Sequence, residues 1–283
     1  MADPAIVAVR FLTYGLAILL FGSAAFAVYT PSDGARPRGT RLPAALPLLL
    51  TLAAFAYVLL LARAASGAAQ WPGLDLVVAI YTGTGFGAAL AVTQAVGVAL
   101  AAPFVSANGL RWPKLVISAV ALATLSFVGH AADGAGWLGV VRLAVLALHL
   151  LAIGAWIGAL PLLWRALAKA RTDPILLLAR FGAIGAVCVA LVLATGVGAL
   201  AFMLAGAHGR LGATYTQALL LKLAFVAGLL CLAAVNRFRL TPLMARDPAR
   251  ARTALRRSII AEQILALGAL AAVALLGQLD PTV

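Results

Sequence analysis

Residues 182–205 read GAIGAVCVALVLATGVGALAFMLA, a stretch of 24 residues without a charged side chain. A helix rises about 1.5 Å per residue, so about 20 apolar residues are enough to cross the hydrocarbon core of a bilayer. The apolar residues are continuous and do not alternate with polar ones, which favours a membrane helix over a barrel strand. This stretch therefore predicts a transmembrane helix.

Seven other stretches have the same character, and the eight predicted spans cover approximately residues 6–29, 43–62, 76–102, 114–132, 138–163, 182–205, 216–236 and 258–278. Over the whole chain 64% of the residues are hydrophobic and 10% are charged, whereas soluble domains are about half apolar and a quarter charged. All connections are short; the longest, at 237–257, is rich in arginine. We therefore predict an all-α integral membrane protein, with residues 1–283 forming one domain of eight transmembrane helices.

The basic residues predict the orientation of the chain in the membrane. Sixteen of the 21 lie in alternate connections: Arg36, Arg38, Arg41, Arg111, Lys114, Arg165, Lys169, Arg171, Arg180, Arg237, Arg239, Arg246, Arg250, Arg252, Arg256 and Arg257. Basic connections face the cytoplasm, so both termini are expected in the periplasm of a bacterial inner membrane. The same rule accounts for the net charge of +13 without a nucleic-acid partner.

Polar side chains inside the hydrocarbon are costly and are functional candidates for that reason. The candidate metal ligands are the three histidines and one methionine of the outer half, namely His130, His149, His208 and Met203. Imidazole and thioether groups bind copper, and soft ligands suit Cu(I) better than Cu(II). The alternatives are that His149 is a polar link between helices and that His208 is an ordinary loop residue.

Further candidates lie deeper in the chain or at its cytoplasmic side. Cys188 and Cys231 are predicted at a similar depth, and with Trp156, Tyr215 and Lys222 they are the candidates for lining an ion path. Cysteines in apolar helices more often serve only packing. The single glutamate, Glu262, is interpreted as a structural ion-pair partner of Arg256.

Known catalytic motifs do not occur in the sequence. It has no HExxH sequence, no phosphate-binding loop and no pair of carboxylates suited to acid–base chemistry, so we do not expect an enzyme. The string from Gly83 to Gly87 lies inside a predicted span and is interpreted as helix packing.

An ordered set of short strings resembles the CopD family of copper-resistance membrane proteins. The strings are Gly129-His130-Ala131-Ala132, His149-Leu150-Leu151-Ala152 with Trp156-Ile157-Gly158, Tyr215 with Leu219-Leu220-Leu221-Lys222-Leu223, Asn236-Arg237, Leu255-Arg256-Arg257-Ser258 with Glu262, and Arg10-Phe11-Leu12 with Gly22. The resemblance covers about residues 10–281. One departure is Leu146, because many relatives have an acidic residue three positions before the second histidine.

The resemblance implies an eight-helix inner-membrane protein that moves copper inward, with His130 and His149 as metal ligands. It also implies a periplasmic copper chaperone of the CopC type as a partner. Two other functions are kept as alternatives. One is a haem-binding redox protein with histidines on adjacent helices, and the other is a membrane protein that binds copper without transporting it.

Overall fold

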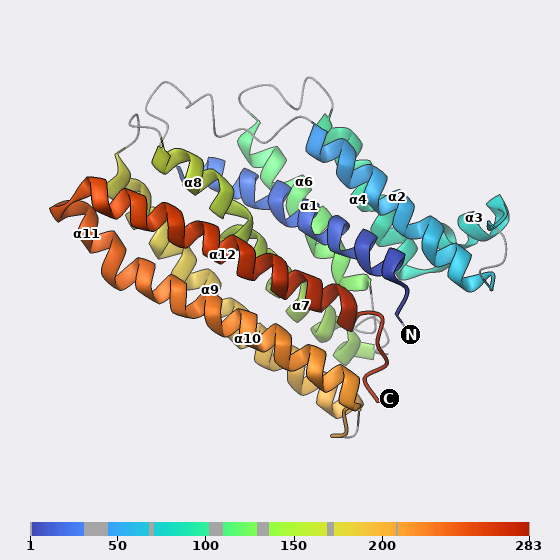
Figure 1. Ribbon diagram of the computed structural model, residues 1–283. Helices are drawn as coiled ribbons and strands as arrows, with labels where there is room; N and C mark the ends of the chain where they lie inside the picture. Colours follow the sequence, from blue (N-terminus) through green and yellow to red (C-terminus); the bar gives the residue numbers. More distant parts are fainter. Residues whose placement is uncertain are drawn as a thin grey trace.

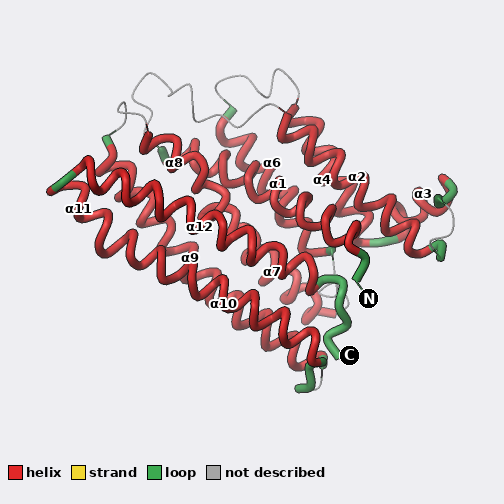
Figure 2. The backbone as a smooth tube through the Cα atoms, in the orientation of Figure 1, coloured by secondary structure: helices red, strands yellow, loops and turns green. Residues whose placement is uncertain are grey.

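The computed structural model describes residues 2–30, 45–67, 71–101, 110–128, 136–168, 173–207 and 209–282. Within these ranges the regular structure is helical and forms a bundle (Figures 1 and 2). In chain order the elements are α1 (Pro4–Tyr29), α2 (Ala45–Ala65), α3 (Leu74–Gly83), α4 (Gly85–Ala101), α6 (Arg111–Thr124), η1 (Leu125–Phe127), α7 (Gly136–Trp156), η3 (Ile157–Ala159), α8 (Leu160–Ala168), α9 (Pro174–Gly206), α10 (Ala213–Val235), η4 (Asn236–Leu240), α11 (Thr241–Arg246) and α12 (Pro248–Leu276).

The all-α membrane class is confirmed, with six described helices long and apolar enough to cross a membrane. The number becomes seven if the bent pair of α3 and α4 counts as one span. The predicted span 114–132 corresponds to α6 and η1; α6 has 14 residues, and residues 129–135 lie outside the described ranges. The described residues therefore support six to seven of the eight predicted spans.

The predicted span 76–102 is not one continuous helix. Thr84 has an extended backbone, and α3 and α4 meet there at an angle of 95°. Its hydroxyl donates to the Ile80 carbonyl (2.7 Å) and accepts from the backbone N–H of Gly87 (3.0 Å), so one side chain caps both helices. A Cβ on Gly87 would lie 2.0 Å from the Ile80 carbonyl oxygen. The glycine string interpreted as helix packing thus forms a break in the helix.

Three long helices begin at the same dipeptide, aspartate followed by proline. The carboxylates of Asp3, Asp173 and Asp247 accept backbone N–H groups of the first helical turn at 2.8–3.0 Å, and a proline follows each of them. Aspartate is a favoured N-cap, and proline fits the first helical position. Because η4, α11 and the start of α12 occupy it, the predicted connection 237–257 is largely helical. The predicted start of the last helix at residue 258 is therefore wrong, since α12 starts at Pro248.

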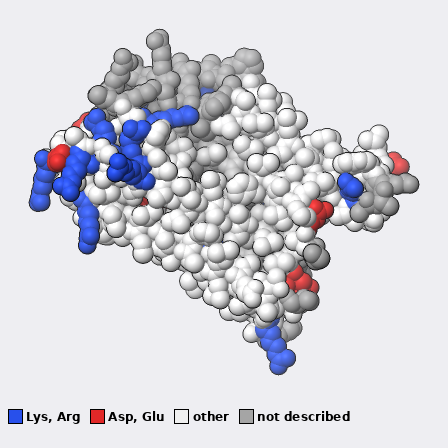
Figure 3. All heavy atoms as spheres, in the orientation of Figure 1, with Lys and Arg blue, Asp and Glu red and all other residues white. Residues whose placement is uncertain are grey.

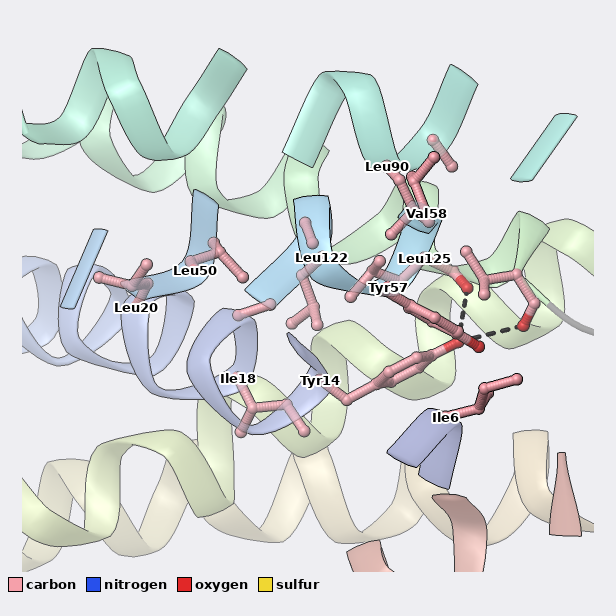
Figure 4. Close-up of a cluster of buried hydrophobic side chains, with 14 of the residues drawn as sticks. Ile6, Tyr14, Ile18, Leu20, Leu50, Tyr57, Val58, Leu90, Leu122 and Leu125 are labelled. Atoms are coloured by element: carbon pink, nitrogen blue, oxygen red, sulfur yellow. Dashed lines mark hydrogen bonds between the residues drawn. The ribbon is translucent and has the colours of Figure 1, made fainter. Parts of the chain in front are cut away.

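Helix α1 lies inside the bundle and packs against α2, α6, α7 and α12. Its apolar side chains join the large cluster of Figure 4, in which Ile18, Tyr57 and Leu122 are buried. Further along α1, its backbone touches η3. A Cβ on Gly158 would lie 2.1 Å from the Ile18 carbonyl oxygen, and a Cβ on Gly22 would lie 2.2 Å from the Gly158 carbonyl carbon. Small residues of this kind let membrane helices approach closely.

The charged side chains are unevenly distributed over the surface. In Figure 3 lysine and arginine gather at the end of the bundle where α8, α11 and the start of α12 lie. The two chain ends lie toward the opposite end of the bundle (Figure 1). The long helices between these ends are mostly apolar on their exposed faces.

Candidate functional site

The predicted site residues are only partly within the described ranges. His149 is described, whereas His130 and His208 lie outside the described residues. Within the part of the chain that the structure describes, no three His, Cys, Asp or Glu side chains lie close enough together to hold a metal ion. The geometry of the candidate site is therefore built outward from His149 on α7.

The site lies along the seam between α7 and α9, which run antiparallel. Two hydrogen-bonded pairs cross this seam, Arg142 with Phe202 and His149 with Thr195, and further along it Trp156 and Cys188 belong to one apolar cluster. Successive pairs are seven residues apart on each helix, which is two turns or about 10 Å. The seam thus carries a polar or sulfur-bearing side chain at each of three levels that are two helical turns apart.

The central pair is joined by a direct hydrogen bond. The Nδ1 atom of His149 lies 2.8 Å from the Oγ1 atom of Thr195. The imidazole packs against the backbone of α9, since a Cβ on Gly196 would lie 3.6 Å from its Cε1 atom. Lys222 on α10 is near enough to contribute to the electrostatic field at the ring.

The pair nearest the start of α7 is a cation over an aromatic ring. The Arg142 guanidinium donates to the Phe202 carbonyl (3.3 Å) and lies 5.4 Å from the centre of the Phe202 ring. Beside it, the Tyr215 hydroxyl donates to the sulfur of Met203 (2.8 Å). Met203 is eight residues beyond Thr195, or about 12 Å along α9. The structure therefore does not bring Met203 into the same coordination sphere as His149.

The inner pair consists of a buried indole and a buried thiol. Trp156 and Cys188 belong to one apolar cluster with Ala152, Val192 and Leu229. Cys188 and Cys231 are both free, but Cys231 is exposed. Of the two cysteines, Cys188 is the one that the fold places inside the bundle below His149.

A buried arginine bonds to Val128, the last described residue before a gap in the described ranges. Arg10 on α1 is 8% exposed and donates to the Tyr57 hydroxyl (3.2 Å) and to the carbonyls of Gly277 and Val128 (3.4 Å each). The Tyr14 hydroxyl lies within hydrogen-bond distance of the Leu125 carbonyl (2.9 Å) and the Val128 carbonyl (3.1 Å), and Figure 4 shows Tyr14 and Leu125 together. Both side chains thus hold the chain two residues before His130.

Sequence reasoning did not single out Thr195, Arg10 or Tyr14 as site residues. The signal for Arg10 was present, because a charged residue inside a span is rare and calls for partners. Thr195 gave a weaker signal. Its importance depends on the register of two antiparallel helices, and one sequence does not reveal that register.

Glu262 and Arg256 contact different neighbours. Glu262 on α12 is 2% exposed, and the Asn236 side chain hydrogen-bonds with its carboxyl group. Asn236 begins η4, a single π-helical stretch that packs against α12. The Arg256 guanidinium lies 4.3 Å from the centre of the Trp164 ring. Each of these two described side chains therefore has a partner other than the one predicted from the sequence.

Replacing Glu262 by alanine is expected to lower stability more than copper affinity. The change leaves the Asn236 amide without its buried partner, which costs about 1–3 kcal/mol. Thermal unfolding in detergent and bound copper per chain measure the two effects. Glu262→Gln is the matched control, because it keeps the length and a hydrogen-bonding oxygen. Normal stability with loss of copper in Glu262→Ala would instead assign the carboxyl group to metal binding.

Comparison with known proteins gives matches over most of the chain. Residues 1–140 match a family model described as copper resistance protein D-like, N-terminal domain, and residues 175–276 match one described as copper resistance protein D. The chain is similar to copper resistance protein D of Pseudomonas syringae pv. tomato, with 33% identity over 311 aligned residues, 99% of this chain and 98% of the relative. No solved structure matches at a comparable level of significance. The similarity thus extends over both chains nearly from end to end.

Proposed function

The chain belongs to the copper resistance protein D family, and we propose that it carries copper ions across the bacterial inner membrane, from the periplasmic face toward the cytoplasm. Family membership supports a role in copper resistance or homeostasis, and the bundle of apolar helices supports a multi-pass membrane protein. The observation that carries the transport role is His149, an imidazole placed between two long helices with a hydrogen-bonded partner.

The proposed orientation has both termini in the periplasm. Arg10 near the start of α1 bonds to Gly277 at the end of α12, so the first and last helices have their outer ends together. Termini on one side require an even number of crossings, which supports eight spans with α6 as part of one of them. The opposite end carries the arginines of α8, α11 and α12, as cytoplasmic ends do (Figure 3).

Copper is the transported ion in this proposal, and Cu(I) fits the donor set better than Cu(II). Cu(I) accepts two or three soft ligands, whereas Cu(II) prefers tetragonal nitrogen and oxygen ligands. His130 would receive the ion at the outer side, His149 would hold it at mid-depth, and Cys188 lies about 10 Å further inward. Conduction requires that each site binds the ion weakly enough to release it. A series of sites with few ligands each satisfies this requirement.

The remaining predicted residues have supporting parts in this proposal. Lys222 on α10 would oppose accumulation of positive charge near His149, which favours release of the ion. Tyr215 engages the Met203 sulfur at the outer end, where Met203 and His208 would assist copper transfer from a CopC-type periplasmic chaperone. Trp156 packs against the α9 residues that lead to Cys188. The role is not enzymatic, and its partners are lipid and the chaperone.

Copper flux into sealed vesicles tests the proposal. Purified protein is reconstituted in liposomes that contain a Cu(I)-responsive dye, and Cu(I) is supplied outside under reducing conditions. We expect wild-type vesicles to accumulate copper and His149→Ala vesicles to match protein-free vesicles. Copper bound without accumulation would contradict transport and favour a binding role. A Soret band in the purified protein would favour the haem-binding alternative.

A further inference from the structure

The hydroxyl group of Thr195 has a fixed hydrogen-bond direction. Its Oγ1 atom lies 2.5 Å from the Leu191 carbonyl oxygen, one turn earlier on α9. A carbonyl only accepts hydrogen bonds, so the single hydroxyl proton of Thr195 points to Leu191. Threonine often makes this bond within a helix, and branching at Cβ restricts the side chain further.

The direction of that bond determines how Thr195 meets His149. With its proton engaged by Leu191, the Oγ1 atom can only accept from the ring nitrogen 2.8 Å away. The Nδ1 atom of His149 must then carry the hydrogen. In a neutral imidazole with a protonated Nδ1, the lone pair is on Nε2, which is the nitrogen free to bind a metal ion.

The acceptors around the imidazole lie on one turn of α9. The side-chain hydrogen bond of the ring is made through Nδ1, and the Val192 carbonyl, which lies 3.4 Å from the Thr195 Oγ1 atom, is a second acceptor for the ring. Both oxygens act as acceptors, so they hold the ring through a protonated nitrogen and leave the lone pair on the other nitrogen. Metal-binding histidines generally show this arrangement, with a partner on the second nitrogen that sets tautomer and orientation.

We propose that Thr195 is a positioning residue, which holds His149 in the Nδ1–H tautomer and presents Nε2 to a soft cation such as Cu(I). This assignment rests on the copper-carrying role proposed above. A neutral hydroxyl leaves the imidazole less basic than a carboxylate partner would, because a carboxylate stabilises positive charge on the ring. Thr195 therefore orients the ligand without making the ion difficult to release.

Thr195→Val and Thr195→Ser separate the hydroxyl from the shape of the side chain. Valine keeps the branched shape and removes the acceptor, whereas serine keeps the hydroxyl. The matched control is Thr93→Val on α4, because buried Thr93 makes the same bond to the carbonyl four residues earlier (2.9 Å) and is on a helix distant in sequence from His149.

The first readout is the protonation of the ring nitrogens, independent of copper. Nitrogen NMR of metal-free protein labelled in histidine, with His149→Ala to assign the signal, distinguishes a protonated from an unprotonated ring nitrogen. We expect a protonated Nδ1 in wild type, Thr195→Ser and Thr93→Val, and a mixture of tautomers in Thr195→Val. A protonated Nε2 as the main form of the wild type would overturn the proposal, even if the valine variant fails to fold.

The second readout is Cu(I) affinity, measured by competition with a chromophoric chelator. We expect about a 10- to 100-fold loss in Thr195→Val, as for removal of other metal-ligand partners, and little change in Thr195→Ser or Thr93→Val. If Thr195→Val keeps the wild-type Cu(I) affinity while His149→Ala loses it, the role of Thr195 is refuted. The same result would support His149 as a copper ligand. A wild type that binds no copper but shows the predicted tautomer would refute the proposed function alone.

Discussion

Replacing His149 by alanine is expected to abolish copper binding while the protein stays folded. The imidazole lies between α7 and α9, where solvent cannot substitute for it as a ligand. Loss of the ligand itself should exceed the roughly 10- to 100-fold loss of affinity that follows from losing a partner of a ligand. Elemental analysis of detergent-purified protein after exposure to Cu(I) measures the effect.

The matched control for this experiment is His208→Ala, which removes an imidazole from the outer loop. We expect it to retain most of the bound copper, because His208 follows the end of α9 and other outer groups can replace it. Equal copper in both variants would exclude His149 as the main ligand. Thermal unfolding of each variant verifies that a loss of copper is not a loss of fold.

The second large effect is expected for Gly158→Ala. The added Cβ would lie 2.1 Å from the Ile18 carbonyl oxygen and 3.1 Å from the Cα of Gly22, and neither backbone atom can rotate away. Overpacking in a core costs about 1–3 kcal/mol when side chains can move, so a backbone clash should cost at least the upper end of that range. We expect little monodisperse protein after extraction, with a markedly lower melting temperature.

Gly206→Ala is the control for that substitution, because a Cβ there meets nothing within 4 Å. It should extract and unfold like wild type. Alanine at Gly158 with wild-type melting behaviour would show that α1 and η3 separate easily, against the close approach that the structure describes. Alanine has a higher helix propensity than glycine at both positions. A difference in stability between the two variants therefore measures the steric contact at Gly158.

The sequence predicted the fold best where one physical effect dominates. Burial of apolar helices in lipid is such an effect, and it was enough to predict an all-α membrane protein. Breaks and boundaries were less predictable. Thr84 ends α3 because its hydroxyl caps two helices at once, and Asp247 starts α12 well before the apolar run begins. Both depend on local hydrogen bonds that hydropathy does not register.

The candidate site was predictable one residue at a time but not as a set. His149 was predicted as a site residue because a polar ring inside the hydrocarbon is energetically costly and therefore indicates a functional role. Its partner Thr195 lies in an apolar helix, where a single threonine does not indicate a site. Only the packing of α7 against α9 shows that it bonds to His149. Many relatives have an acidic residue where this chain has Leu146, whereas the hydrogen-bond partner of His149 in this structure comes from another helix.

Arg10 has a consequence for how the protein is made. It enters the membrane with the first helix, and a charged residue there costs up to about 2.5–3.5 kcal/mol on insertion scales. Two of its acceptors, the Val128 and Gly277 carbonyls, lie far later in the chain. The Arg10 guanidinium therefore cannot complete its set of hydrogen bonds until the last helix has been synthesised. Chains truncated before Gly277 lack that final acceptor, which makes completion of the C-terminus a checkpoint in assembly.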